Sequence, residues 1–299
     1  MSATYRIRRG ITLVEILVAI AIMAVLVGLL LVAVQKVRVS GVQAQNKNNL
    51  RQMILAVHQI ADEDAGDIKK LAKADMKGVH FGNASLSLYY RMIPIVHGVM
   101  VFPSNPTPEA VLEFSQPIVK VYQNPADPSW SHDPMFGPIR TKVSYAFNMV
   151  AFNGSISLVS SIPDGTSQTI AIGDKYFARG GNEPSGPKTY HVYDQIFEPS
   201  RSDNIAGARR PTFVDRAWGD VMPVTDTKTH TTRASVPGKT YDVAKRPEDV
   251  DPHILSTPYH SGLTVALFDG SVRTLSPNIS ESSFWTMITP AAGDIGNRD

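Results

Sequence analysis

The sequence predicts an α+β protein in which one long N-terminal helix packs on an antiparallel β-sheet in a loop-rich globular head. Three observations lead to this fold class. Residues 16–34 carry no charge and no hydrogen-bonding side chain. The proline-free stretch that follows, as far as Ile60, repeats apolar residues at three- and four-residue intervals, which is typical of an amphipathic helix. Beyond it, short β-branched and aromatic runs alternate with Pro, Gly and Asn, the pattern of strands and turns.

The first residues have an unusual order. Arg8, Arg9 and Gly10 come first, Glu15 follows, and then the apolar run begins. A helix of about 20 residues, at about 1.5 Å each, is long enough to cross a bilayer core. A carboxylate at the centre of such a helix costs about 2.5–3.5 kcal/mol, and less near an end, so Glu15 calls for a partner. Cleavage after Gly10 would supply one, since the new ammonium of Ile11 is a cation that a neighbouring subunit can present.

This arrangement resembles the signal of type IV pilins and type II secretion pseudopilins. Gly10 matches the glycine after which a prepilin peptidase cuts in that family, and Glu15 matches the glutamate at the fifth mature position. Ile11 stands where the family usually has a methylated Phe or Met. The resemblance implies a leader over residues 1–10, a transmembrane or filament-core helix over 11–34, an amphipathic continuation over 35–60, and a β-rich head over 61–299.

Other interpretations of the apolar run stay open: an ordinary secretory signal peptide, a simple N-terminal membrane anchor, and a buried core helix. Glu15 at the head of the run fits none of them well. Residues 1–10 contain three arginines and no acid, which favours a cytoplasmic leader. We therefore expect a single-pass protein of the inner membrane, with its head in the periplasm or, after assembly, at the cell surface.

The elements after the apolar run follow from local patterns. An apolar stripe on the continuing helix consists of Leu50, Met53, Ile54, Val57 and Ile60, and the acids at 62–64 suit a solvated helix end. Strands are predicted over Gly98–Phe102, Ile118–Tyr122, Lys142–Phe147, Ser155–Val159, Thr169–Ile172, Leu263–Phe268 and Ser271–Leu275, while residues 178–250 read as loops. Asp269-Gly270 predicts a hairpin with a type I′ turn. Ser280 or Asn278 is expected to cap a final short helix that carries Phe284 and Trp285.

Several motifs, taken with the N-terminus, resemble a large bacterial family of unknown function whose members begin with a prepilin-type signal. The motifs are Asn48-Asn49-Leu50-Arg51-Gln52, Ser144-Tyr145-Ala146-Phe147-Asn148, Asp164-Gly165-Thr166-Ser167-Gln168-Thr169, Ile172-Gly173-Asp174-Lys175, and His260-Ser261-Gly262 leading into Phe268-Asp269-Gly270-Ser271-Val272. The family commonly has a Cys-Pro-Ser-Asp-Pro segment, where this chain has Asn124-Pro125-Ala126-Asp127-Pro128. Any disulfide of the relatives is therefore absent here.

Composition and motifs argue against catalysis. The chain has no cysteine, which excludes thiol chemistry and Cys-based metal sites. No nucleophile elbow, phosphate-binding loop or His-Glu-x-x-His is present, so we expect no enzyme. Asp164 and Asp269 are interpreted as turn residues, with calcium as the less favoured alternative, and no cofactor is expected. The ring of His260 is expected to hold its loop by a hydrogen bond to the backbone, before Gly262.

The sequence thus favours a structural role, as a subunit of a pilus-like filament or a secretion pseudopilus. The expected partners are prepilin peptidase, other copies or other pilin-like subunits, and the inner membrane. A net charge of +2 gives no strong field for nucleic acid, so none is expected. The alternative is a membrane-tethered module whose head binds a glycan or a protein, and an anchored hydrolase is disfavoured by the motif search.

Overall fold

The structure, a computed structural model, describes residues 12–63, 89, 92, 95–96, 119–131, 142–152, 162–179, 189–191, 208–209, 211–216, 219–226, 228–229 and 231–290. The chain divides into two compact units, Met1–Ala44 and Gln45–Asp299. The strands expected over 98–102 and 155–159 lie outside the described residues.

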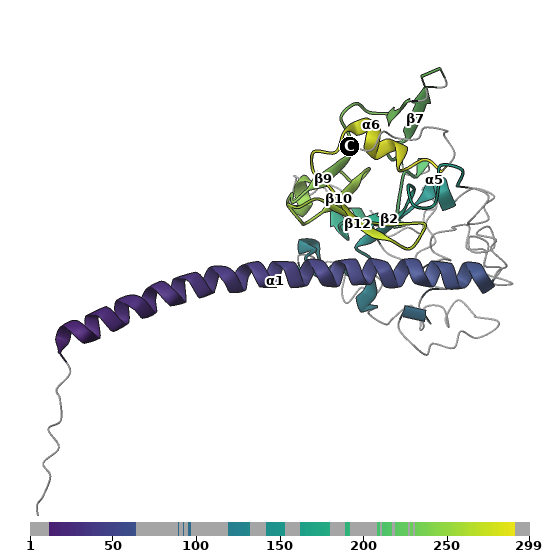
Figure 1. The fold of residues 1–299 in the computed structure, drawn as a ribbon. Coiled ribbons are helices and arrows are strands. Elements are labelled where there is room, and N and C mark those ends of the chain that lie inside the picture. The colour runs from purple at the N-terminus through teal and green to yellow at the C-terminus, as the bar shows by residue number, and fades with distance from the viewer. Residues whose placement is uncertain are drawn as a thin grey trace, which may run out of the picture. The chain divides into compact units, whose positions relative to one another are not determined.

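The long helix is confirmed. Helix α1 covers Leu13–Glu63, 51 residues, because no proline interrupts it and its apolar residues are good helix formers (Figure 1). In the first unit the large apolar side chains from Leu13 to Val39 are 51–74% exposed. In the second unit the predicted stripe of α1 is fully buried, from Leu50 to Ile60, while Asp62 is exposed near the helix end.

A five-stranded sheet organises the second unit, with strand order β12-β11-β2-β1-β6. Its strands are β1 (Tyr145–Asn148), β2 (Ile170–Asp174), β6 (Thr212–Phe213), β11 (Leu263–Leu267) and β12 (Val272–Leu275). All neighbouring strands are antiparallel except β6, which runs parallel to β1. The α+β class and the antiparallel sheet are thus confirmed, with one parallel strand at the edge.

The sheet separates two apolar cores, because side chains alternate between its faces. On β11, Ala266 packs into the core that holds the stripe of α1, whereas Val265 and Leu267 pack into the opposite core. That second core contains Phe284 and Trp285 of the short helix α6 (Glu281–Thr286). Ser280 caps α6 by accepting the backbone N–H of Ser283, as predicted.

The remaining elements are short. They are α5 (Met149–Phe152), β3 (Ala178–Arg179), β4 (Thr189–His191), β5 (Ala208–Arg209), β7 (Pro223–Asp226), β8 (Thr231–Ala234), β9 (Tyr241–Val243), β10 (Leu255–Thr257), and the 3-10 helices η1 (Lys120–Tyr122), η2 (Pro128–Ser131) and η4 (Pro247–Asp249). Small sheets pair β3-β4-β5, β7-β8 and β9-β10, so the region expected to be loops also contains strands.

Two local predictions were wrong. The segment Ile118–Tyr122 is not a strand: residues 120–122 form η1, where the N–H of Tyr122 donates to Val119 O at 2.9 Å. Hydrogen bonds within the segment pair the backbone N–H groups of Tyr122 and Gln123, and the buried Tyr122 ring fixes η1 in the core. The last hairpin exists, but Asp269 does not adopt positive φ, as a type I′ turn requires; only Gly270 does, at +85°. Gly270 N donates to Leu267 O, which gives a three-residue loop in place of the two-residue turn.

Candidate functional site

The start of α1 is closed by a pair of reciprocal hydrogen bonds. Thr12 precedes the first helical residue, and its N–H donates to Glu15 Oε2 at 2.8 Å. In return, the N–H of Glu15 donates to Thr12 Oγ1 at 3.3 Å. This is a capping box, and its Thr-x-x-Glu signature was readable in the sequence but was missed. Glu15 therefore has a local role at the helix start, whatever partner it finds elsewhere. Gly10 and Ile11 lie outside the described residues.

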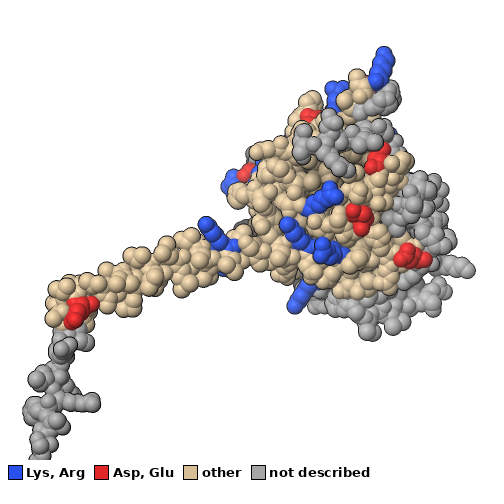
Figure 2. Space-filling model, viewed as in Figure 1, with Lys and Arg blue, Asp and Glu red and all other residues tan. Residues whose placement is uncertain are grey.

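The apolar side chains of α1 from Leu13 to Val39 are exposed in the described part of the chain. Figure 2 shows this segment without charge between the acidic group at its start and the first basic groups further along. By length and composition α1 can cross a membrane, and none of its most apolar window is buried. A helix that is apolar all round is stable only where lipid or other protein surrounds it.

The second unit contains a buried polar network centred on Asp174, at the end of β2. Its carboxylate accepts hydrogen bonds from Asn46 Nδ2 at 3.0 Å, Thr257 Oγ1 at 3.1 Å and the N–H of Thr264 at 3.3 Å. Asp174 is fully buried, and Asn46 and Thr257 are too. Asn46 lies on α1, Thr257 on β10 and Thr264 on β11. One carboxylate thus joins the helix segment to three strands.

The network continues from the helix to the segment before β1. Tyr145 donates its hydroxyl to Asn46 Oδ1 at 2.7 Å, and Asn49 donates its amide to Gln123 O at 2.9 Å. Tyr259 donates its hydroxyl to Asn124 Oδ1 at 2.8 Å. The two buried asparagines of α1, Asn46 and Asn49, therefore form hydrogen bonds with residues far along the chain.

A second buried carboxylate, Asp127, holds the same region together. It accepts hydrogen bonds from the N–H of Ser129, from Ser144 Oγ at 2.7 Å, and from the N–H of Phe177 at 2.9 Å. Asp127 lies in the Asn124–Pro128 segment, which contains no cysteine. Here hydrogen bonds, together with packing, tie this segment to the residues flanking β1 and β2.

Burial governs the acidity of these groups. Burial raises the pKa of Asp174 from 3.8 to about 7, although hydrogen bonds from Asn46 and Thr257 oppose the shift. Burial also raises the pKa of Asp127, against the effect of Ser129 and Ser144. The pKa of Tyr145 rises well above its usual value, mainly through burial and also through the charge of Asp174.

Most motifs of the second resemblance meet in this network, which sequence reasoning did not foresee. Asn49, Tyr145 and Asp174 come from three of the five motifs, and they share one buried cluster with Asp127 of the Asn124–Pro128 segment. The signal for Asn46 was available: it lies four residues before Leu50, at a position of the apolar stripe where a polar side chain is out of place. Residues of these motifs thus bind the head to the Gln45–Glu63 segment of α1.

In the His260-Ser261-Gly262 motif, the structure explains the glycine but not the histidine. Gly262 has φ +120°, and a Cβ there would lie 1.9 Å from Leu275 O, so only glycine fits. His260 is exposed, and its ring makes no hydrogen bond within the described part of the chain. The expected bond from His260 to the backbone is therefore not seen there.

The calcium candidates lie in turns, as predicted. Asp164 precedes Gly165, whose φ is +97° and whose N–H donates to Ile162 O. Asp269 accepts the N–H of Ser271 at 2.8 Å in the hairpin loop. Within the described residues, no group of three His, Asp or Glu side chains is placed to hold a metal ion.

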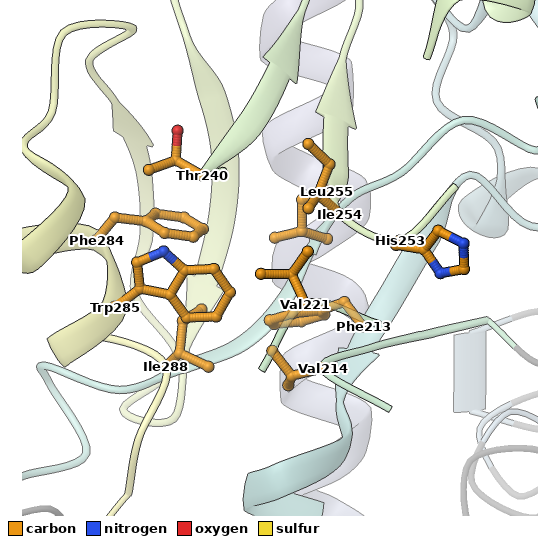
Figure 3. A pocket seen from close by; sticks show the side chains of 10 residues that line it. All are labelled: Phe213, Val214, Val221, Thr240, His253, Ile254, Leu255, Phe284, Trp285 and Ile288. Atoms are coloured by element: carbon orange, nitrogen blue, oxygen red, sulfur yellow. The ribbon is translucent and has the colours of Figure 1, made fainter. Parts of the chain in front are cut away.

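The second core contains one small pocket. It is lined by apolar side chains, among them Phe213, Trp285 and Ile288, while His253 turns its ring away from it (Figure 3). The cavity of about 10 Å³ has room for one water molecule at most. Trp285 is buried here as a core residue, with its indole N–H donating to Lys239 O. This pocket does not have the size of a ligand site.

Comparison with known proteins identifies the N-terminus. Residues 5–31 match the family model described as the prokaryotic N-terminal methylation motif. Neither the curated proteins nor the solved structures contain a match. The match includes Gly10, Ile11 and Glu15, and it coincides with the uncovered apolar part of α1. The chain therefore carries a prepilin-type signal, which supports a pilin- or pseudopilin-like exported protein and implies processing by prepilin peptidase and association with the membrane.

Proposed function

We propose that this protein is a structural subunit of a pilus-like filament or a secretion pseudopilus. Prepilin peptidase would cut between Gly10 and Ile11. The subunit would wait in the inner membrane with its head outside, and then join a filament in which apolar helices pack on one another.

The observation that carries this proposal is the uncovered apolar helix with a single carboxylate at its start. An ordinary anchor needs the apolar run, and its helix start can be capped without a carboxylate, which carries an insertion cost. A helix bundle that buries Glu15 beside the Ile11 ammonium of a neighbour gives each charge a partner of opposite sign. Buried charges occur in proteins when they are paired in this way.

The hydrogen-bond network of the head supports a structural task. Two of its buried carboxylates, Asp127 and Asp174, accept several hydrogen bonds each from the protein itself. The network instead holds the Gln45–Glu63 segment of α1 to the sheet. A head attached in this way passes force from the filament core into a folded domain.

Filament isolation with mass spectrometry tests the proposal. Sheared surface fractions and envelope fractions are examined for this chain, and its N-terminal peptide is sequenced. We expect a peptide that begins at Ile11 and filaments that contain the chain. Processed chain found only as single molecules in the membrane would instead favour a tethered binding module, and a peptide that begins at Met1 would refute processing.

A further inference from the structure

The buried network contains a carboxyl group with no cation to balance it. No Lys, Arg or His side chain lies within ion-pair distance of Asp174 among the described residues. Lys175, the next residue, directs its ammonium to Thr212 O at 2.8 Å. The other titratable groups around Asp174 are Tyr145 on β1, Tyr259 before β11, and Asp127, and none of them brings a positive charge.

The network can also accept a proton on Asp174 Oδ2. Thr257 Oγ1 lies 3.1 Å from Asp174 Oδ2 and 3.4 Å from Gly262 O. When Asp174 is ionised, the Thr257 hydroxyl donates to the carboxylate. When a proton from solvent binds Oδ2, the carboxyl O–H donates to Thr257 Oγ1, and the Thr257 hydroxyl donates to Gly262 O. Asn46 can donate to Oδ1 in both arrangements.

We propose that Asp174 is a proton-operated clasp, by which the head holds the Gln45–Glu63 segment of α1 more tightly when this carboxyl group is protonated than when it is ionised. The geometry provides a bonded arrangement for each state. The difference in strength comes from the cost of a buried charge that hydrogen bonds alone must stabilise.

The direction of the pH effect follows from linkage. Because the pKa of Asp174 is raised to about 7 in the fold, the folded protein holds a proton that the unfolded chain has already released above pH 4. The stabilisation is fully present below the unfolded pKa of 3.8 and is lost as the pH rises through about 7. The clasp is therefore tight in mildly acidic surroundings and weakened above neutrality. This inference concerns the head alone and does not rest on filament assembly.

Hydrogen exchange on the full chain in detergent micelles tests the clasp. Amides of residues 45–61 are followed from pH 5 to pH 8, and rates are corrected for intrinsic exchange. We expect their opening constant to rise by up to about tenfold per pH unit between pH 5 and pH 7, the limit for one linked proton. Infrared difference spectra should show a protonated carboxyl band that disappears over the same range.

Amino-acid substitutions test whether Asp174 causes the pH dependence of hydrogen exchange. Asp174→Asn mimics the protonated form and should remove both the pH dependence and the infrared band. Thr257→Val removes a hydroxyl whose hydrogen bond lowers the pKa of Asp174, so the titration should shift to higher pH, whereas Thr257→Ser should keep it near the wild-type position. This pair replaces Asp174→Asn if that variant does not fold. His58→Gln, His253→Gln and His260→Gln are the controls, because each removes a histidine from the head and leaves Asp174 in place.

Two results would overturn the proposal. One is a pH dependence that persists in Asp174→Asn, or that is lost in a histidine variant while Thr257→Val leaves the titration at its wild-type position. The other is a wild-type carboxyl band that titrates while the protection of residues 45–61 stays constant, since Asp174 would then bind a proton without changing the hold on the helix.

Discussion

Asn46 on α1 donates its side-chain amide to Asp174 on β2, 128 positions later, at 3.0 Å. The same amide group accepts the hydroxyl of Tyr145 through Oδ1 at 2.7 Å. One side chain of the helix thus satisfies a buried carboxylate and a buried phenol at once. The helix segment belongs to the head by polar as well as apolar contacts, and the first predictions concern this junction.

Replacing Asn46 by Leu should destabilise the head. The change removes one donor from the buried Asp174 and the acceptor of Tyr145, and groups left unsatisfied in this way cost about 1–3 kcal/mol each. We expect a loss of about 2–4 kcal/mol in the free energy of unfolding, measured by urea denaturation followed by tryptophan fluorescence. Asn48→Leu, at an exposed neighbouring position, is the control and should change stability by no more than about 0.5 kcal/mol. Equal effects of the two variants would contradict the role of the network.

Replacing Gly262 by Ala should be severely destabilising. The new methyl group would lie 1.9 Å from Leu275 O, and backbone cannot move aside as a flexible side chain can. Gly238→Ala is the matched control, because Gly238 also has positive φ, +72°, but has open space around its Cβ position. We expect Gly238→Ala to cost about 1–2 kcal/mol from backbone strain and Gly262→Ala to cost clearly more. Thermal unfolding of the two variants measures the difference, and similar melting temperatures would refute the close approach.

Replacing Glu15 by Leu should abolish assembly while sparing processing. If Glu15 pairs with the Ile11 ammonium of a neighbour, the Leu variant leaves one unpaired buried charge per subunit, a loss of about 3–5 kcal/mol. We therefore expect cleavage after Gly10 to persist and filament yield to fall sharply, as measured in sheared fractions beside wild type.

Glu15→Gln separates the two roles of this residue. Gln retains the capping-box bond to Thr12 but carries no charge. If pairing with the ammonium drives assembly, Gln should fail as Leu does. Filaments at wild-type yield from Glu15→Gln would show that helix capping, and not charge, is the contribution of Glu15.

Removing the first 34 residues should leave a soluble, monomeric and folded head. The exposed apolar side chains cluster in the removed part, while the stripe from Leu50 to Ile60 that completes the core is retained. Analytical ultracentrifugation and circular dichroism of residues 35–299, with and without a chelator, measure this. Aggregation of well-expressed protein, or unfolding on chelation, would contradict the prediction.

Several elements of this protein were determined by the sequence itself. The helix from residue 13 onward, the strands of the final hairpin and the Ser280 cap depend on contacts between residues close in the chain, so local patterns predict them. The prepilin-type signal is also a local pattern, since a peptidase reads it before assembly. The capping box of Thr12 and Glu15 was equally local and could have been predicted.

Tertiary structure decided the rest, because it depends on partners far apart in sequence. Residues 120–122 have the β-branched and aromatic composition of a strand, yet a 3-10 helix forms there, in which the Tyr122 ring is buried in the core. The meeting of Asn46, Tyr145 and Asp174 likewise depends on how α1 lies on the sheet. A buried carboxylate gains its donors only after the chain has folded, so no spacing in the sequence could show that these residues form one network.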